Sequence, residues 1–170
     1  MLNIGAMMVL IISLYVDDLL LTRNNAWLVQ EFKQEMVKVF EMTELGLMSF
    51  FLGMEIKQDE YEVFICQKKY AKEILKKFKF GKCKEANSPM NQKEKLCKED
   101  GADKINEGYF RSLIGCLIYL TATCLDILNV VSILSRFMHY TNELHLKAAK
   151  RVILYVKGTS DFGFKFTKNK

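Results

Sequence analysis

The sequence predicts an α+β fold in which antiparallel strands come first and helices follow. Runs of β-branched and long aliphatic residues at 9–14 and 19–22 are typical of strands, and residues 50–65 carry a similar pattern. Apolar residues then recur at helical spacing from residue 68 onward. The chain has 170 residues, of which 50% are hydrophobic and one is proline, so it can bury one ordinary core or two small lobes.

Two adjacent acids separate the first two strand-like runs. We therefore expect a β-hairpin with Asp17 and Asp18 at its tip and buried strands on either side. The apolar stretch over residues 2–16 could also be interpreted as a membrane anchor. It is shorter than the roughly 20 residues that a membrane helix needs, and it runs directly into the two acids, so a strand is favoured.

A helix of about four turns is predicted after this hairpin. Asn24 and Asn25 supply a turn and a helix cap. The apolar residues that follow at helical spacing are Leu28, Phe32, Met36, Val39 and Phe40. A second hairpin is predicted next, with one strand over 50–56, a polar turn at 59–60 and another strand over 63–65.

Residues 68–80 predict a helix with an apolar seam and a basic face. The seam consists of Tyr70, Ile74, Leu75 and Phe78, and six lysines are distributed over other positions of the helix. Residues 81–108 contain Pro89 and little periodic hydrophobicity, so we expect a long surface connection there.

Two further helical regions are predicted, at 109–140 and at 144–156. Gly158 is expected to cap the second of them, because glycine is favoured just past a helix end. Phenylalanines alternate with smaller or polar residues over 162–166, which predicts a final strand.

Charge and cysteine usage limit the class of protein. A net charge of +5 permits binding to a polyanion without requiring it. The five cysteines form no Cys-x-x-Cys pair and have no ordered spacing to His139 or His145, which argues against a zinc site and favours structural or surface roles for both histidines. An odd cysteine count without a secretion or other targeting signal predicts a reduced intracellular protein, cytoplasmic or nuclear.

The acidic pair is the sharpest chemical feature of the sequence. Two carboxylates between apolar strands are costly unless the turn is exposed or a cation neutralises them. Carboxylates at a rigid tip hold hard divalent ions well, and nucleotidyl transfer uses two such ions roughly 3.5–4 Å apart. An Asp-Asp pair by itself is more often a solvated turn, so the dipeptide alone does not decide between the two interpretations.

Ordered blocks along the chain strengthen the metal interpretation. The first is Tyr-Val-Asp-Asp at residues 15–18. The later blocks are Phe-Leu-Gly-Met-Glu-Ile at 51–56, Cys-Gln-Lys-Lys-Tyr at 66–70, Ser-Pro-Met at 88–90, Tyr-Phe-Arg-Ser-Leu-Ile-Gly at 109–115, Leu-Ser-Arg-Phe-Met at 134–138 and His-Leu-Lys-Ala-Ala-Lys-Arg-Val at 145–152. Together they resemble the reverse transcriptase domain of the Pol polyprotein of copia-type LTR retrotransposons, over nearly the whole chain.

This resemblance implies RNA-directed DNA synthesis and assigns roles to individual residues. Asp17 and Asp18 would be the catalytic carboxylates and would bind Mg²⁺ or Mn²⁺. Asp17 is expected to be the direct ligand, because neighbouring strand residues point to opposite faces. The residues expected near the incoming nucleotide and the primer are Tyr15, Val16, Phe51, Leu52 and Gly53. The residues expected to contact the nucleic-acid backbone are Lys68, Lys69, Lys72 and Lys76.

The resemblance also implies a domain plan and a set of partners. Residues 1–66 would be the carboxy-terminal part of a polymerase palm, 67–157 a helical thumb-like or connection region, and 158–170 a strand leading toward a ribonuclease H region. The implied partners are an RNA/DNA template–primer duplex, a deoxynucleoside triphosphate and the remainder of the polyprotein, with no membrane. The family's fingers and a further catalytic aspartate would lie before Met1, so we expect no activity from this chain alone.

Several features have alternative interpretations. Gly53 is as well explained by a strand bend as by a primer contact. The lysines of 68–79 can form a solvated face, and solvation is favoured for Lys147, Lys150 and Arg151. The sequence departs from the family pattern at 124–127, where Cys-Leu-Asp-Ile replaces Arg-Pro-Asp-Ile. Two rival functions therefore remain, a nucleic-acid-binding module without catalysis and an inert relic of a retroelement.

Overall fold

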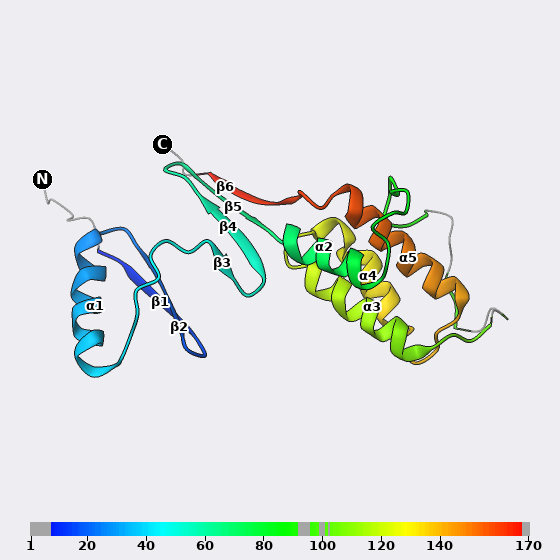
Figure 1. Ribbon diagram of the computed structural model, residues 1–170, viewed down its shortest axis with the longest axis horizontal. Coiled ribbons are helices and arrows are strands. Elements are labelled where there is room, and N and C mark those ends of the chain that lie inside the picture. Colours follow the sequence, from blue (N-terminus) through cyan, green and yellow to red (C-terminus); the bar gives the residue numbers. More distant parts are fainter. Residues whose placement is uncertain (1–7, 92–95, 99–100, 102, 168–170) are drawn as a thin grey trace, which may run out of the picture. The chain divides into compact units, whose positions relative to one another are not determined.

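The computed structural model describes residues 8–91, 96–98, 101 and 103–167, and the chain divides into two compact units, Met1–Gly46 and Leu47–Lys170. Over these described residues it contains five α-helices, one short 3₁₀-helix and two antiparallel sheets (Figure 1). This confirms the predicted α+β class. Among the same residues, no helix is both long and apolar enough to cross a membrane.

The first unit is a hairpin followed by one helix. β1 (Leu10–Tyr15) and β2 (Asp18–Arg23) pair antiparallel, and α1 (Ala26–Val39) packs against β2. The predicted asparagines act at the junction. The Asn24 side chain accepts from the backbone N–H of Val9 at 2.8 Å, and the Asn25 side chain accepts from Trp27 N–H at 2.9 Å as the N-cap of α1. The hairpin and the capped helix are both confirmed.

The first unit has almost no core of its own. Val29 is its one buried apolar residue within the described range, whereas β1 is exposed over nearly its full length. The large apolar residues left exposed include Ile11, Ile12, Leu14, Val16, Trp27, Val37, Val39 and Phe40. The prediction of buried strands is therefore wrong within this chain, because one helix cannot cover both faces of a two-stranded sheet.

The second unit contains a four-stranded sheet in the order β3-β4-β5-β6. Its strands are β3 (Phe50–Phe51), β4 (Met54–Gln58), β5 (Glu62–Cys66) and β6 (Gly163–Thr167). The single strand predicted over 50–56 is wrong, because Leu52 and Gly53 form a two-residue turn with φ of +47° and +73°. Positive φ at both turn positions matches the right-handed twist of a hairpin and is easily adopted by glycine.

A helical bundle forms the other part of the second unit (Figure 1). Its elements are α2 (Lys68–Lys77), α3 (Glu107–Leu120), the 3₁₀-helix η1 (Leu125–Ile127), α4 (Leu128–Ser135) and α5 (Glu143–Gly158). Fully buried side chains from α2 to α5 form the core, among them Phe110, Leu113, Ile114, Leu117, Leu134, Val152 and Ile153. Most of the hydrophobic stabilisation of the described chain therefore comes from this bundle.

Two helix boundaries differ from the sequence prediction. The region predicted as one stretch over 109–140 is broken after Leu120, where the Thr121 hydroxyl donates to the Ile118 carbonyl at 2.6 Å. Such a side chain competes with the next helical turn for a backbone partner. Gly158 is the last residue of α5 and not its cap, which is Thr159.

The connection after α2 is fastened to α5. Arg151 Nε donates to the Ser88 carbonyl at 3.1 Å, and Arg151 Nη2 donates to the Ser88 hydroxyl at 2.9 Å. Nearby, Lys157 Nζ donates to the Cys83 carbonyl at 2.8 Å. The prediction that Arg151 is solvated is therefore wrong, because its guanidinium fixes the Ser-Pro-Met block to the helix.

His145 has a structural role, as one of the two interpretations predicted. Its ring is fully buried and stacks on Phe137 with a centroid distance of 4.1 Å. It also completes a capping box at the start of α5, in which Nδ1 accepts the Asn142 N–H and the Asn142 side chain accepts the His145 N–H. His139 is exposed, with Nδ1 lying 3.0 Å from Arg111 Nη2.

Tyr155 of α5 provides a pH-dependent contact. Its hydroxyl donates to the Asp126 carboxylate, and this hydrogen bond, together with partial burial, raises the pKa of Tyr155 from 10.0 to about 12. The favoured form in the folded state is the neutral one. Its contribution to stability is therefore fully present below pH 10 and is lost as the pH rises toward about 12.

We expect Tyr155→Phe to reduce the loss of stability at alkaline pH. Between pH 10 and about 12, the free energy of unfolding of the unsubstituted chain should fall more steeply than that of the variant. Urea unfolding at several pH values across this window measures the slope of the free energy of unfolding against pH for each protein. The titrations of lysines and cysteines are common to both proteins and cancel in the comparison. Parallel slopes would show that the Tyr155–Asp126 contact does not stabilise the fold.

Candidate functional site

The predicted catalytic residues lie at the tip of the β1–β2 hairpin. Tyr15 pairs with Asp18, and Val16 and Asp17 form the two-residue turn between them. Val16 has a φ of +51° and is 76% exposed. The first position of such a turn favours glycine, so a β-branched residue there holds the backbone in a strained conformation. Strain of this kind is concentrated at functional sites.

The two carboxylates at this tip are exposed and available. None of the ion pairs among the described residues involves Asp17 or Asp18. Asp17 lies in the turn and Asp18 is the first residue of β2, so strand alternation does not decide which carboxylate would face a ligand. The assignment of Asp17 as the direct ligand stays a prediction.

The donor atoms at the tip are carboxylate oxygens, a type of ligand that suits a divalent metal. Carboxylate oxygens are the ligands that Mg²⁺ and Mn²⁺ prefer, and Mg²⁺ is commonly held by one or two carboxylates together with substrate phosphates. Within the described part of the chain, no group of three or more His, Cys, Asp or Glu side chains is placed to hold a metal. Asp17 and Asp18 therefore offer two ligands and need others.

The predicted primer-contact residues occupy the turn between β3 and β4 in the second unit. Phe51 closes β3, and Leu52 and Gly53 form the turn. The Tyr119 hydroxyl of α3 donates a hydrogen bond to the Leu52 carbonyl. A Cβ added at Gly53 would lie 2.5 Å from the Tyr119 hydroxyl oxygen. Gly53 is thus explained by the turn and by the close approach of Tyr119, a residue that sequence reasoning missed.

Glu55 is a second residue that sequence reasoning did not single out. Its carboxylate accepts the backbone N–H of Lys69 at 2.6 Å, in the first turn of α2. A negative charge at a helix N-terminus is stabilised by the unpaired N–H groups and the helix dipole. The glutamate of the Phe-Leu-Gly-Met-Glu-Ile block therefore joins the β3–β4 hairpin to α2.

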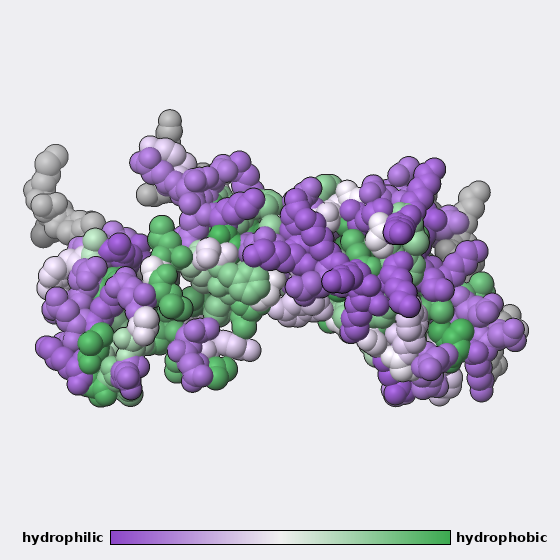
Figure 2. Space-filling view, viewed as in Figure 1, coloured by the Kyte–Doolittle hydropathy of each residue, from purple (hydrophilic) through white to green (hydrophobic). Residues whose placement is uncertain are grey.

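The four predicted backbone-contact lysines divide into two groups. Lys68 forms an ion pair with Asp161, and this contact raises the pKa of Lys68 and lowers the pKa of Asp161. Lys69, Lys72 and Lys76 are exposed on one side of α2, three and four residues apart. Hydrophilic residues cover α2 in the space-filling view (Figure 2). We call Lys69, Lys72 and Lys76 the lysine stripe.

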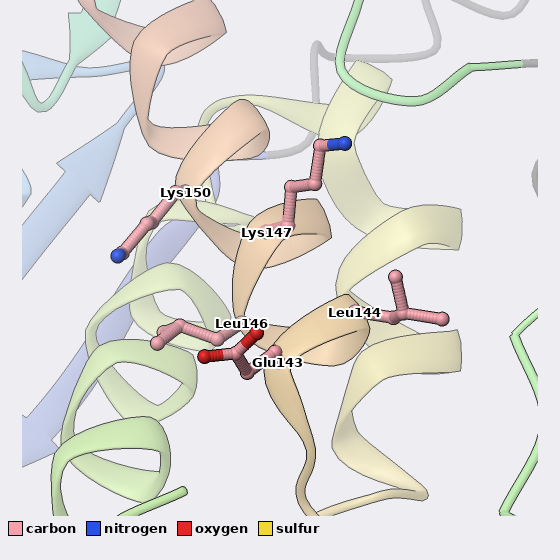
Figure 3. A pocket seen from close by; sticks show the side chains of 5 residues that line it. All are labelled: Glu143, Leu144, Leu146, Lys147 and Lys150. Atoms are coloured by element: carbon pink, nitrogen blue, oxygen red, sulfur yellow. The ribbon is translucent and has the colours of Figure 1, made fainter. Parts of the chain in front are cut away.

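A surface hollow of about 400 Å³ lies along the start of α5. It is lined by Glu143, Leu144, Leu146, Lys147 and Lys150. Figure 3 shows that the ends of Lys147 and Lys150 point away from each other, so their charges do not converge on one position. The hollow therefore lacks the convergent polar groups of a ligand site.

Comparison with known proteins identifies the family of the chain. The family model described as "Reverse transcriptase (RNA-dependent DNA polymerase)" matches residues 3–92, which include both hairpins and α2. The chain belongs to this family of polymerases. Among its members, it is distantly homologous to the Pol polyproteins of copia-type retrotransposons, which confirms the resemblance found in the sequence.

Individual relatives cover most of the chain. An uncharacterized mitochondrial protein of Arabidopsis thaliana is 36% identical over 156 residues, which are 92% of this chain and 65% of that protein. The Retrovirus-related Pol polyprotein from transposon RE1 of Arabidopsis thaliana is 32% identical over 88% of this chain and 10% of its own length. The corresponding polyprotein from transposon TNT 1-94 of Nicotiana tabacum is 29% identical over 89% of this chain and 12% of its own length.

The chain thus spans about two thirds of one relative and about a tenth of the polyproteins. No solved structure matches it significantly.

Proposed function

We propose that the chain supplies the metal-binding hairpin and part of the template–primer surface for RNA-directed DNA synthesis. The observation that carries this proposal is the pair Asp17 and Asp18, exposed at a strained hairpin tip inside the region matched by the family model. In the domain plan that we propose, residues 1–66 belong to the polymerase palm, 67–157 to a thumb-like or connection region, and 158–170 lead toward a ribonuclease H region.

The proposed chemistry is in-line attack of a primer 3′-hydroxyl on a deoxynucleoside triphosphate, with release of pyrophosphate. Bound Mg²⁺ or Mn²⁺ would activate the hydroxyl and neutralise the departing charge. The carboxylate oxygens of Asp17 and Asp18 at the tip would bind the metal ions, and Tyr15 and Val16 lie next to them. Phe51, Leu52, Gly53 and the lysine stripe contact the nucleic acid.

We propose that this chain binds its substrates but does not complete the reaction alone. Two carboxylates are fewer ligands than a two-metal site needs, and the described residues place no third acid in a metal-binding group. The missing ligands would come from the remainder of the polyprotein, which is therefore the proposed partner.

Metal binding provides the direct test. In the presence of template–primer and deoxynucleoside triphosphate, we expect the chain to bind Mn²⁺, as measured by electron paramagnetic resonance. The double variant Asp17→Asn/Asp18→Asn should bind it at least about tenfold more weakly, because both anionic ligands are lost.

An acidic pair in another turn gives a matched control. Asp59 and Glu60 lie in the turn between β4 and β5 and are exposed. The variant Asp59→Asn/Glu60→Gln has the same change of charge and should keep the Mn²⁺ affinity of the unsubstituted chain. Equal affinities in all three proteins would contradict the proposed role of Asp17 and Asp18.

The lysine stripe favours a second candidate function, nucleic-acid binding without catalysis. Such a module would bind a duplex with a steep dependence on salt and would be indifferent to Asp17→Asn. A filter-binding titration against salt separates it from an inert relic, which would bind no duplex at any salt concentration. Primer extension that disappears with Asp17→Asn would instead identify an autonomous polymerase.

A further inference from the structure

The β3–β4 hairpin is joined to the helical bundle by two hydrogen bonds. The Tyr119 hydroxyl of α3 donates to the Leu52 carbonyl at the tip of the turn. In the following strand, Glu55 of β4 accepts the Lys69 N–H of α2 at 2.6 Å. A turn of two residues would otherwise be free to pivot about the two-residue strand β3. These contacts fix its direction relative to α2 and α3.

We propose that Tyr119 is a positioning residue, which holds the β3–β4 turn in the orientation in which it contacts the primer strand. This inference rests on the proposed function, because it takes the turn to be a nucleic-acid contact. Tyr119 itself touches no substrate in this proposal and acts through Leu52 and Gly53.

The backbone of the turn explains why an anchor is needed. Leu52 has a φ of +47°, a conformation that residues other than glycine adopt at a cost. The hydrogen bond from Tyr119 offsets part of that cost and fixes the peptide between Leu52 and Gly53. The Tyr119 ring is in turn held edge-on by Tyr70, with a centroid distance of 4.8 Å. The anchor is therefore itself oriented by α2.

The location of Tyr119 favours a positioning role over a packing role. Its side chain is 40% exposed, whereas Leu117 and Leu120 of the same helix are fully buried in the core. Removing the Tyr119 hydroxyl leaves this core packing in place. The Tyr119 hydroxyl binds the turn through the Leu52 carbonyl.

The turn presents groups that suit a nucleic acid. Phe50, at the start of β3, is 53% exposed, and Lys69 Nζ lies 5.6 Å from the centre of its ring. An exposed aromatic ring and a cation side by side can stack on a base and contact a phosphate. The direction of Phe50 follows that of the turn, because it lies three residues before Gly53, whereas Lys69 is held by α2, whose backbone N–H at Lys69 binds Glu55. Tyr119 thus helps to keep the Phe50 ring beside Lys69.

The test compares two nucleic acids with the 170-residue chain and its Tyr119→Phe variant. One is an RNA/DNA duplex with a recessed primer 3′-end, and the other is a blunt duplex of the same length. By fluorescence anisotropy, Tyr119→Phe should weaken binding to the recessed duplex about 3- to 10-fold, the effect of one hydrogen bond. Binding to the blunt duplex, and the salt dependence of both, should not change, whereas general destabilisation would weaken both equally.

Tyr61→Phe is the matched control. Tyr61 lies in the neighbouring β4–β5 turn and is 58% exposed, so this variant removes a hydroxyl from the same sheet without touching the β3–β4 turn. It should bind both duplexes as the unsubstituted chain does. Equal losses in the two variants would overturn the inference.

A double-mutant cycle with Gly53→Ala supplies a second measurement. In the unsubstituted chain the new Cβ would press on the Tyr119 hydroxyl, 2.5 Å away. In the Tyr119→Phe background that oxygen is gone, so Gly53→Ala should weaken recessed-duplex binding less than it does when Tyr119 is present. Independent, multiplicative effects would overturn the proposed coupling of Tyr119 to the turn.

The outcomes separate this inference from the proposed function. If the unsubstituted chain prefers the recessed duplex and Tyr119→Phe retains that preference, the inference alone fails. If the unsubstituted chain shows no preference for a recessed end, both the turn's role in primer contact and the role of Tyr119 are wrong.

Discussion

Replacing Phe110 by alanine is expected to lower the free energy of unfolding by about 3–5 kcal/mol. Phe110 lies in the first half of α3, is 0% exposed and belongs to the core cluster that joins α2, α3, α4 and α5. Its removal leaves a cavity between helices that can close only in part. Urea unfolding followed by circular dichroism measures the loss, because most of the helical signal comes from this bundle.

Ile118→Ala is the control for this prediction. Ile118 lies on the same helix and is 45% exposed, so its truncation should cost less than about 1 kcal/mol. If both variants lost the same stability, the face of α3 that carries Phe110 would not be the one that packs in solution.

The second large effect concerns the lysine stripe. Lys72→Gln/Lys76→Gln is expected to weaken duplex binding at low salt at least about tenfold. The slope of log affinity against log salt should become shallower by about 2, because each lost phosphate contact removes about 0.9 from it. Binding titrations at several salt concentrations measure both quantities. Since neither lysine is buried, the variant should fold as the unsubstituted chain does.

Two lysines on α5 test whether duplex binding depends on the position of the lysines or only on the net charge of the chain. Lys147→Gln/Lys150→Gln removes the same charge from another helix, and Figure 3 shows these side chains diverging. This variant should keep the original salt slope. A single Lys68→Gln should also have little effect, because Asp161 already neutralises Lys68. Equal slopes for both double variants would exclude the lysine stripe as a specific interface.

Much of the first unit could be predicted from the sequence because its structure is local. The hairpin around Asp17 and Asp18 and the helix capped by Asn25 depend on residues close together in the chain. The exposure of β1 could not be predicted, because apolar residues identify a strand but not the number of elements that cover it. The roles of the two aspartates stay predictions.

In the second unit, the missed features are contacts between residues far apart in sequence. Tyr119 reaches Leu52, and Arg151 reaches Ser88, yet no periodicity of the sequence marks either pair. The turn at Gly53 was missed for a different reason. An apolar run with one glycine is compatible with a bent strand or with two short strands, and Tyr119 contacts the chain at this point.

The pairing of β6 with β5 has a consequence for biosynthesis. A ribosome makes β5 early and β6 only after every helix of the bundle, yet the two lie hydrogen-bonded side by side. During translation the edge of β5 that later pairs with β6 is therefore exposed for a time. It can then pair with any extended nascent segment nearby. Slow elongation through the bundle would prolong that interval, so misassembly should depend on the speed of synthesis as well as on the final stability.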